Sequence, residues 1–155
     1  MMRVDSHHHF WKYSVEQYGW INEKMQVLRR DFSPKDLLAE IQSTHIDAVV
    51  SVQARQEVEE TRFLIDHAKG HSWIRGVVGW VPLANPSVGK ILESFQNESV
   101  LKGVRHVVQD EPDEKFFDGE DFNRGIRLLR SYQMIYDILI FGKQLPMTIR
   151  FVDRH

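Results

Sequence analysis

Short β-branched runs alternate along the chain with amphipathic stretches, so the hydrophobic period switches repeatedly between two and about 3.6 residues. The first period predicts strands and the second predicts helices. The expected strands are "RVDSH" (3–7), "DAVVSVQA" (47–54), "IRGVVGWVP" (74–82), "KGVRHVV" (102–108) and "MIYDILIF" (134–141). The expected helices are "SPKDLLAEIQ" (33–42), "EVEETRFLIDHAKG" (57–70), "SVGKILESFQ" (87–96), "DFNRGIRLLRSYQ" (121–133) and "QLPMTIRFVDRH" (144–155).

Two helix ends carry clear capping signals. Ser33 is expected as the N-cap of the first helix, with Pro34 at its first position and Asp36 at its third. The second helix closes with Lys69 and with Gly70, a residue suited to a left-handed cap.

Residues 12–31 show no clean period, which predicts a long ordered loop. The aromatic cluster from Phe10 to Trp20 has two interpretations. It forms one wall or a lid of a site, or it forms a small satellite core beneath the loop.

The alternation predicts five βα units, spaced by 45, 28, 27 and 34 residues between Val4, Val49, Val77, Val104 and Ile138. Such a chain forms parallel strands joined by right-handed crossovers, with helices covering the sheet. Two α/β architectures compete. A five-stranded open doubly wound sheet fits 155 residues, whereas a closed (β/α)₈ barrel needs about 250. Length alone favours the open sheet, although no glycine-rich phosphate loop follows the first strand.

Composition narrows the classes of partner and ligand. A net charge of -2 gives no general attraction for nucleic acid or for an anionic membrane. The absence of cysteine leaves histidine and carboxylate as the strong metal ligands. No signal peptide and no run of about 18 apolar residues is present, so we expect a soluble cytoplasmic protein.

Three consecutive histidines end the first expected strand. On an extended strand His7 and His9 project from one face together with Asp5, while His8 points to the other face. Two imidazoles at the carboxyl end of a strand can bind one divalent ion. A purification-tag remnant is disfavoured because the histidines lie between Val-Asp-Ser and Phe-Trp, and purely structural histidines are the alternative.

Five motifs, in the same order along the chain, strengthen the prediction of a metal site. They resemble the amidohydrolase-related family of metal-dependent hydrolases, which includes sugar-acid lactonases such as the L-fuconolactonases and is similar to the pyrone dicarboxylate lactonases. The motifs are "VDSHHHFW" (4–11), "VVSVQARQEVEETRFL" (49–64), "GVVGWVPL" (76–83), "LKGVRHVVQDEPD" (101–113) and "YDILIFGKQLP" (136–146).

This resemblance implies a (β/α)₈ TIM-barrel fold, of which residues 1–155 are the first five βα units and the N-terminal part of a single domain. It implies that His7 and His9 bind a divalent metal, with zinc foremost, although some relatives are thought to work without metal. A further histidine and the aspartate that serves as general base are expected beyond residue 155. The chain is therefore expected to be inactive by itself, as a truncated reading frame or a fragment, with two open sheet edges that favour association or disorder.

Polar or aromatic side chains end the later strands, where barrel enzymes place their chemistry. The candidate substrate-binding residues are Gln53, Trp80, Arg105, His106 and Asp137. The Gln53 amide can donate to a carbonyl, the Trp80 ring can pack on a sugar, and the Arg105 fork suits a carboxylate or an oxyanion.

Each candidate also has a structural interpretation. Gln53 can cap a turn, Trp80 can be a core residue, and Arg105 can form a salt bridge to an acid of the following loop or to Asp137. His106 is expected to point away from the Arg105 face. Asp137 lies between apolar strand residues, so its carboxylate requires compensation by Arg105 or by a substrate hydroxyl.

The favoured function for the complete protein is hydrolysis of a sugar-acid lactone by metal-activated water. Another carboxylic-acid hydrolase or decarboxylase of the same superfamily is the first alternative. A non-catalytic βα binding module is the second. The expected partner is a small molecule rather than nucleic acid or membrane, and a homo-oligomer is left open.

Overall fold

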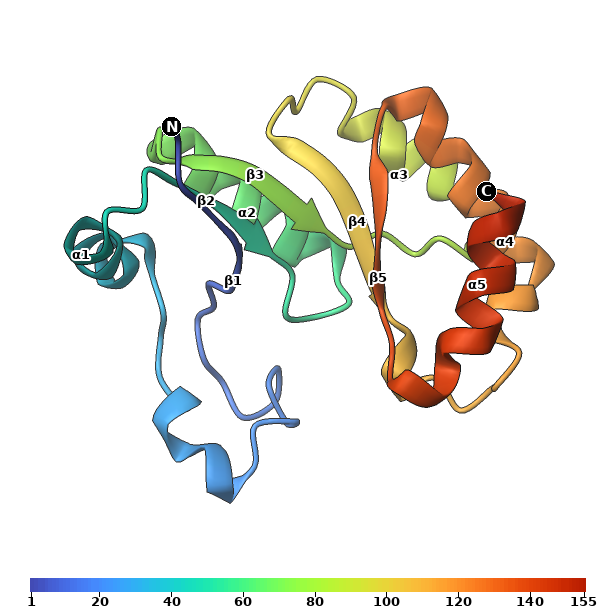
Figure 1. Ribbon diagram of the computed structural model, residues 1–155, viewed down its shortest axis with the longest axis horizontal. Helices are drawn as coiled ribbons and strands as arrows, with labels where there is room; N and C mark the ends of the chain where they lie inside the picture. The colour runs from blue at the N-terminus through green and yellow to red at the C-terminus, as the bar shows by residue number, and fades with distance from the viewer.

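The computed structural model describes residues 1–155 and contains one sheet of five parallel strands. The strands pair in chain order, each beside its predecessor, which is the order of a barrel wall and not of a doubly wound sheet with its reversal point. Figure 1 shows the sheet curled, with helices on its outer side. The barrel-type prediction is confirmed. The strands are β1 (Val4–His8), β2 (Ala48–Val52), β3 (Ile74–Gly79), β4 (Leu101–Val107) and β5 (Ile135–Leu139).

One helix follows each strand after a loop of variable length. The helices are α1 (Pro34–Thr44), α2 (Val58–Gly70), α3 (Val88–Ser94), α4 (Glu120–Leu129) and α5 (Leu145–Arg154). None of them has the length and apolar content that crossing a bilayer requires. All ten predicted elements are present, each shifted by a few residues at its ends.

The two predicted helix caps have different outcomes. Ser33 is the N-cap of α1, and its backbone N–H donates to the Asp36 carboxylate at 2.9 Å. Gly70, however, has no positive φ, so the predicted left-handed cap is wrong. The left-handed residues are His45 after α1 and Gln133 before β5.

The main core lies between the sheet and the helices. Its strand side includes Val49, Val77 and Val104, all with no exposed surface. Its helix side includes Leu64 from α2 and Leu92 from α3, which are also fully buried. This layer covers the convex face, and the cavity on the concave face is lined by both polar and apolar side chains.

The segment between β1 and α1 forms the satellite core, one of the two interpretations of its aromatic residues, while its role as a wall of a site stays a prediction. Trp11, Tyr18 and Ile21 are buried in a satellite cluster of their own. Backbone hydrogen bonds between Trp11 and Phe32 hold the two ends of the segment together at 3.0 and 3.1 Å. Trp20 lies at the surface with 50% exposure, on the side of the concave face.

The sheet has two open edges, because β1 and β5 each pair on one side only. Large apolar side chains are exposed on β5, where Ile135 is 58% exposed. They continue along α5 as a stripe of Leu145, Ile149 and Val152, each more than half exposed, which we call the α5 apolar stripe. Exposed apolar surface next to an unpaired strand edge favours association.

We expect residues 1–155 expressed alone to associate with rising concentration. Ile149→Lys combined with Val152→Lys places two charges on the α5 apolar stripe and should shift the mass toward the monomer. Size-exclusion chromatography with light scattering measures this shift. A compact monomer with a cooperative melt for the unmodified chain would contradict the expectation.

The close approach between α4 and the loop after β3 predicts how a substitution in α4 changes stability. A Cβ on Gly125 would overlap the carbonyl oxygen of Leu83. Gly125→Ala should therefore lower the free energy of unfolding by about 1–3 kcal/mol, although alanine is the better helix former. Gly89→Ala in α3 is the matched control, since nothing lies within 4 Å of its added methyl group, and it should raise stability by about 0.5 kcal/mol. Urea denaturation of both variants gives the comparison.

Candidate active site

A β-bulge in β1 decides where the three histidines point. Asp5 pairs with Val49 and His8 pairs with Ser51, so three steps along β1 match two steps along β2. The bulge is supported by a hydrogen bond from the His7 backbone N–H to the Asp5 carboxylate at 3.1 Å. Residues two apart in β2 share a face, so Asp5 shares its face with His8. The prediction from simple alternation, which placed Asp5 with His7 and His9, is wrong.

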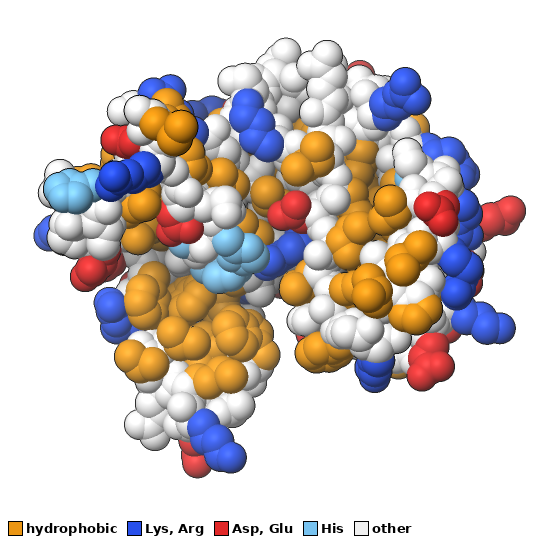
Figure 2. Space-filling view, viewed as in Figure 1, with side chains coloured by type: hydrophobic (Ala, Val, Ile, Leu, Met, Phe, Trp, Pro, Cys, Tyr) orange, Lys and Arg blue, Asp and Glu red, His pale blue; other side chains and the backbone are white.

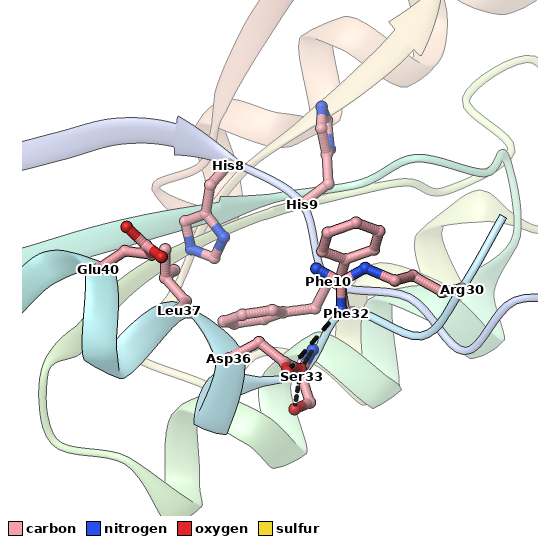
Figure 3. A pocket seen from close by; sticks show the side chains of 9 residues that line it. All are labelled: His8, His9, Phe10, Arg30, Phe32, Ser33, Asp36, Leu37 and Glu40. Atoms are coloured by element: carbon pink, nitrogen blue, oxygen red, sulfur yellow. Dashed lines mark hydrogen bonds and ion pairs between the residues drawn. The ribbon is translucent and has the colours of Figure 1, made fainter. Parts of the chain in front are cut away.

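His8 lies on the helix side of β1. Its Nε2 contacts the Ser51 hydroxyl at 3.1 Å, while its Nδ1 is buried without a hydrogen-bond partner. Burial lowers the pKa of His8 to about 4. Figure 3 shows His8 directed toward α1 and His9 directed away from it. A cavity of about 230 Å³ lies between β1 and α1. It is lined by His8, His9, Phe10, Arg30, Phe32, Ser33, Asp36, Leu37 and Glu40.

His7 and His9 come together on the concave side, with ring centroids 5.0 Å apart in an edge-to-face arrangement. The His9 Nδ1 lies 2.8 Å from the Val52 carbonyl oxygen, which can only accept, so Nδ1 carries the proton and Nε2 is free. Burial lowers the pKa of both imidazoles, and the Arg105 charge lowers them further. Both rings are therefore neutral at neutral pH.

Arg105 is the buried cation of the concave face, with 6% exposure. Its Nη2 donates to the Gln53 backbone carbonyl at 2.5 Å and contacts the Gln53 side-chain oxygen at 3.3 Å. Its Nη1 donates to His7 Nε2 at 3.2 Å. Nε is buried without a partner. The guanidinium thus joins β1, β2 and β4 across the inside of the sheet.

No carboxylate lies within 4.0 Å of Arg105, so the salt bridge considered for it does not form. Burial lowers the pKa of Arg105, and the charges of Asp137 and Glu60 act against that shift. Asp137 is half-buried and pairs in register with Arg105 on the neighbouring strand. Its carboxylate therefore contributes a field at Arg105 without a contact.

His9, Gln53 and Arg105 line a cavity of about 330 Å³ at the carboxyl ends of the strands, whereas His7 and Asp137 are not part of its lining. In the space-filling view, the concave side is hollowed between the β1–α1 segment and the β5–α5 side, with histidine and basic side chains at its head (Figure 2). The cavity lining is His9, Trp20, Gln53, Ala54, Arg105, Val107, Asp110 and Leu139. Trp20 and Asp110 were not predicted individually as site residues, because both lie in loops without a period.

Trp80 and His106 do not line this cavity. The Trp80 indole N–H donates to His106 Nδ1 at 3.3 Å, and His106 Nε2 lies 2.5 Å from the Glu111 carboxylate. Since indole only donates, Nδ1 accepts and the Nε2 proton goes to Glu111. The His106 ring also stacks on Phe116, on the face opposite Arg105 as expected. The substrate-binding roles of Trp80 and His106 stay predictions, and their contacts favour a role in ordering the loop after β4.

Thr61 of α2 fixes the end of β3. Its hydroxyl accepts from the Trp80 backbone N–H at 2.7 Å and donates to the Trp80 carbonyl at 2.8 Å. This contact requires glycine at position 79, because a Cβ there would overlap the Thr61 side chain. No sequence pattern indicates this pair beyond the small residue at the strand end.

A divalent ion fits this site only in part. The free Nε2 of neutral His9, oriented by a backbone carbonyl, has the chemistry of a metal ligand. His7 Nε2 already accepts from Arg105, so binding through it requires the guanidinium to move. No group of three or more suitable side chains converges in residues 1–155. The chain therefore supplies two candidate ligands and not a complete metal site.

The chain is similar to known proteins along its whole length. A family model described as "Amidohydrolase" matches residues 4–155. An L-fucono-1,5-lactonase of Burkholderia multivorans is 39% identical over 155 residues, covering 99% of this chain and 52% of the lactonase. The chain spans about half the length of the curated lactonases it matches.

Two crystal structures of an amidohydrolase from Burkholderia multivorans superpose on this chain with a TM-score of 0.95 at 38% identity. They cover all of this chain and 55% and 54% of the respective crystallised chains. One contains bound zinc and the other bound HEPES.

Substitutions of the two tryptophans near the site should differ in their effect on the free energy of unfolding. Trp80→Phe removes the donor to His106 and should cost about 0.5–1.5 kcal/mol of unfolding free energy. Trp20→Phe should cost little, because Trp20 is half exposed and its indole N–H makes no hydrogen bond to the protein. Chemical denaturation tests the contrast, and nitrogen NMR shifts of His106 report its tautomer. Equal losses in the two variants would contradict the assigned contact.

Proposed function

Because this chain belongs to the amidohydrolase family, we propose that the protein of which it forms the N-terminal half-barrel hydrolyses the lactone ring of a sugar acid. The likeness to L-fucono-1,5-lactonases along the whole chain supports this substrate class. In the proposed reaction, water adds to the lactone carbonyl, the ring C–O bond breaks, and a hydroxy acid is released.

One observation in the chain supports a substrate with oxygen acceptors more than any other. Arg105 is buried with no carboxylate within 4.0 Å, and its Nε has no partner. A buried guanidinium in this condition is stabilised by a ligand oxygen that carries full or developing negative charge. The carbonyl oxygen of a lactone acquires that charge when water attacks it.

This placement of Arg105 suggests roles for two cavity residues, Gln53 and Trp20, and for Asp137 on the neighbouring strand. Gln53 holds the guanidinium through its backbone and side-chain oxygens, and so orients it toward the substrate. The exposed ring of Trp20 can cover the apolar side of a sugar ring. Asp137 is proposed to bind a substrate hydroxyl, since no ion pair engages it.

His7 and His9 are proposed to hold a divalent ion, zinc in the first instance, with ligands from outside residues 1–155. When bound, such an ion polarises a carbonyl and makes a coordinated water more acidic. In a metal-free scheme the donor to the carbonyl is the Nδ1–H of neutral His7, because the His9 proton is engaged by the Val52 carbonyl and its free Nε2 can only accept. In both schemes the general base lies outside residues 1–155, so this chain is expected to be inactive alone.

Activity of the full-length protein tests the proposal. L-Fucono-1,5-lactone and related aldonolactones are assayed by acid release, beside aromatic carboxylic acids assayed for decarboxylation. Hydrolysis of lactones alone supports the proposal, and turnover of the carboxylic acids alone overturns it. Chelator treatment followed by zinc addition separates the metal-dependent scheme from the metal-free one.

Arg105→Lys should lower kcat/KM for the lactone about 100-fold in the full-length protein. Lysine keeps the charge but loses the planar fork that contacts Gln53 and His7 at once. Arg75→Lys is the control, because Arg75 is exposed on β3 and makes no ion pair. Equal activity of the two variants would show that Arg105 does not bind the reacting group.

A further inference from the structure

Glu60 is a buried carboxylate that the proposed reaction does not use. It lies in the first turn of α2 and is 1% exposed, whereas Glu57 and Glu59 of the same turn are exposed. Its position repeats at intervals of four with Leu64 and Ala68, which form the buried stripe of the helix. An acid on that stripe carries a desolvation cost that must be offset by its contacts.

Those contacts join two segments that line the cavity. One carboxylate oxygen accepts from the backbone N–H groups of Ala54 at 3.0 Å and Arg55 at 2.6 Å, directly after Gln53. The other accepts from the Tyr18 hydroxyl at 3.4 Å. Tyr18 is 2% exposed and stands two residues before Trp20.

Arg55 closes the same cluster. Its guanidinium lies over the Tyr18 ring at 5.4 Å, and its Nε approaches the Glu60 carboxylate at 3.8 Å. The carboxylate, the tyrosine and the arginine thus hold the β1–α1 segment against the loop after β2. Apart from this cluster, Ala54 of the loop after β2 packs against the satellite cluster of Trp11, Tyr18 and Ile21.

We propose that Glu60 is a positioning residue, which fastens the Tyr18–Trp20 stretch to the Gln53–Arg55 loop so that both walls face one substrate. The contribution to substrate binding rests on the proposed function, whereas the fastening of the loop does not. Burial raises the pKa of Glu60, and the two backbone donors and Arg55 oppose this shift. The Tyr18 hydroxyl and the Ala54 and Arg55 backbone N–H groups all donate to the side chain, so its role in these contacts is that of an acceptor.

Limited trypsin digestion of the full-length protein tests the fastening. Lys24 is exposed within the β1–α1 segment, but cleavage there requires the segment to open locally. Glu60→Ala should accelerate cleavage at Lys24 about tenfold. Glu59→Ala is the matched control from the same helical turn and should leave the rate unchanged. Glu60→Gln keeps one acceptor oxygen and should restore most of the protection.

A second variant covers the case in which Glu60→Ala does not fold. Tyr18→Phe removes only the hydroxyl that reaches Glu60, and it should also accelerate cleavage at Lys24. Tyr13→Phe is its control, because the Tyr13 hydroxyl has no protein partner although its ring stacks on Tyr18. Cleavage rates at Lys24 that match the respective controls would overturn the proposal.

Kinetics separate positioning from a general loss of structure. Glu60→Ala should raise KM for the lactone about tenfold and lower kcat by a smaller factor, since it displaces the walls directly and reaches Arg105 only through the contact with Gln53. A fall in kcat with KM unchanged would overturn the positioning role. If the unmodified protein hydrolyses no lactone, the proposed function fails, while the digestion result still decides the fastening.

Discussion

A guanidinium buried inside a curled sheet is the constraint around which the polar face of this chain is arranged. Arg105 must be placed by acceptors, because an unpaired buried cation would be too costly to keep. The Gln53 carbonyl and His7 provide those acceptors, and they belong to two other strands. Since the carbonyl and the imidazole are uncharged, the positive charge is held in place without being neutralised. That condition favours binding of an oxygen on which negative charge develops during a reaction.

The rigidity behind this face comes from polar groups on the convex side of the sheet. Thr61 binds both backbone groups of Trp80, and the Trp80 indole in turn fixes His106. Glu60, the neighbour of Thr61, binds the loop that follows Gln53. One helical turn thus determines where two strands end. Hydrogen bonds to backbone groups can hold the ends of these strands, since they leave the side chains of the loops free to face the cavity.

The sequence predicted the elements of the fold well because each depends on local patterns. Valine runs, the Ser33 cap and the spacing of the βα units are all readable without tertiary information. The sheet order was less accessible. Chain length favoured an open doubly wound sheet, and only the family resemblance pointed to a barrel wall.

Several features of the site could not be predicted, because each depends on a contact between distant segments. Strand alternation cannot show the bulge that separates Asp5 from His7, since a bulge is defined by pairing with β2. Gly70 has the composition of a left-handed cap, but the helix ends without one. The place of Trp80 at a strand end left a sugar platform and a core residue open, and its contact with His106 depends on a different strand. The spacing of Glu60, four residues before Leu64, does place an acid on the buried side of α2. That spacing does not show which groups bind the acid.

The exposure of the site residues follows their place in the sheet. Arg105 lies on β4 and Gln53 directly follows β2, both strands with neighbours on both sides, and both residues are buried. His7 and Asp137 lie on the edge strands, and their side chains are only partly covered. The residues that a metal ion or a substrate hydroxyl would engage are thus those that lack a neighbouring strand. The lactonases that this chain matches are about twice as long. An edge strand completed by further βα units would bury His7 and Asp137 in the same way as Arg105, and would strengthen every electrostatic contact in the cavity by excluding water from it.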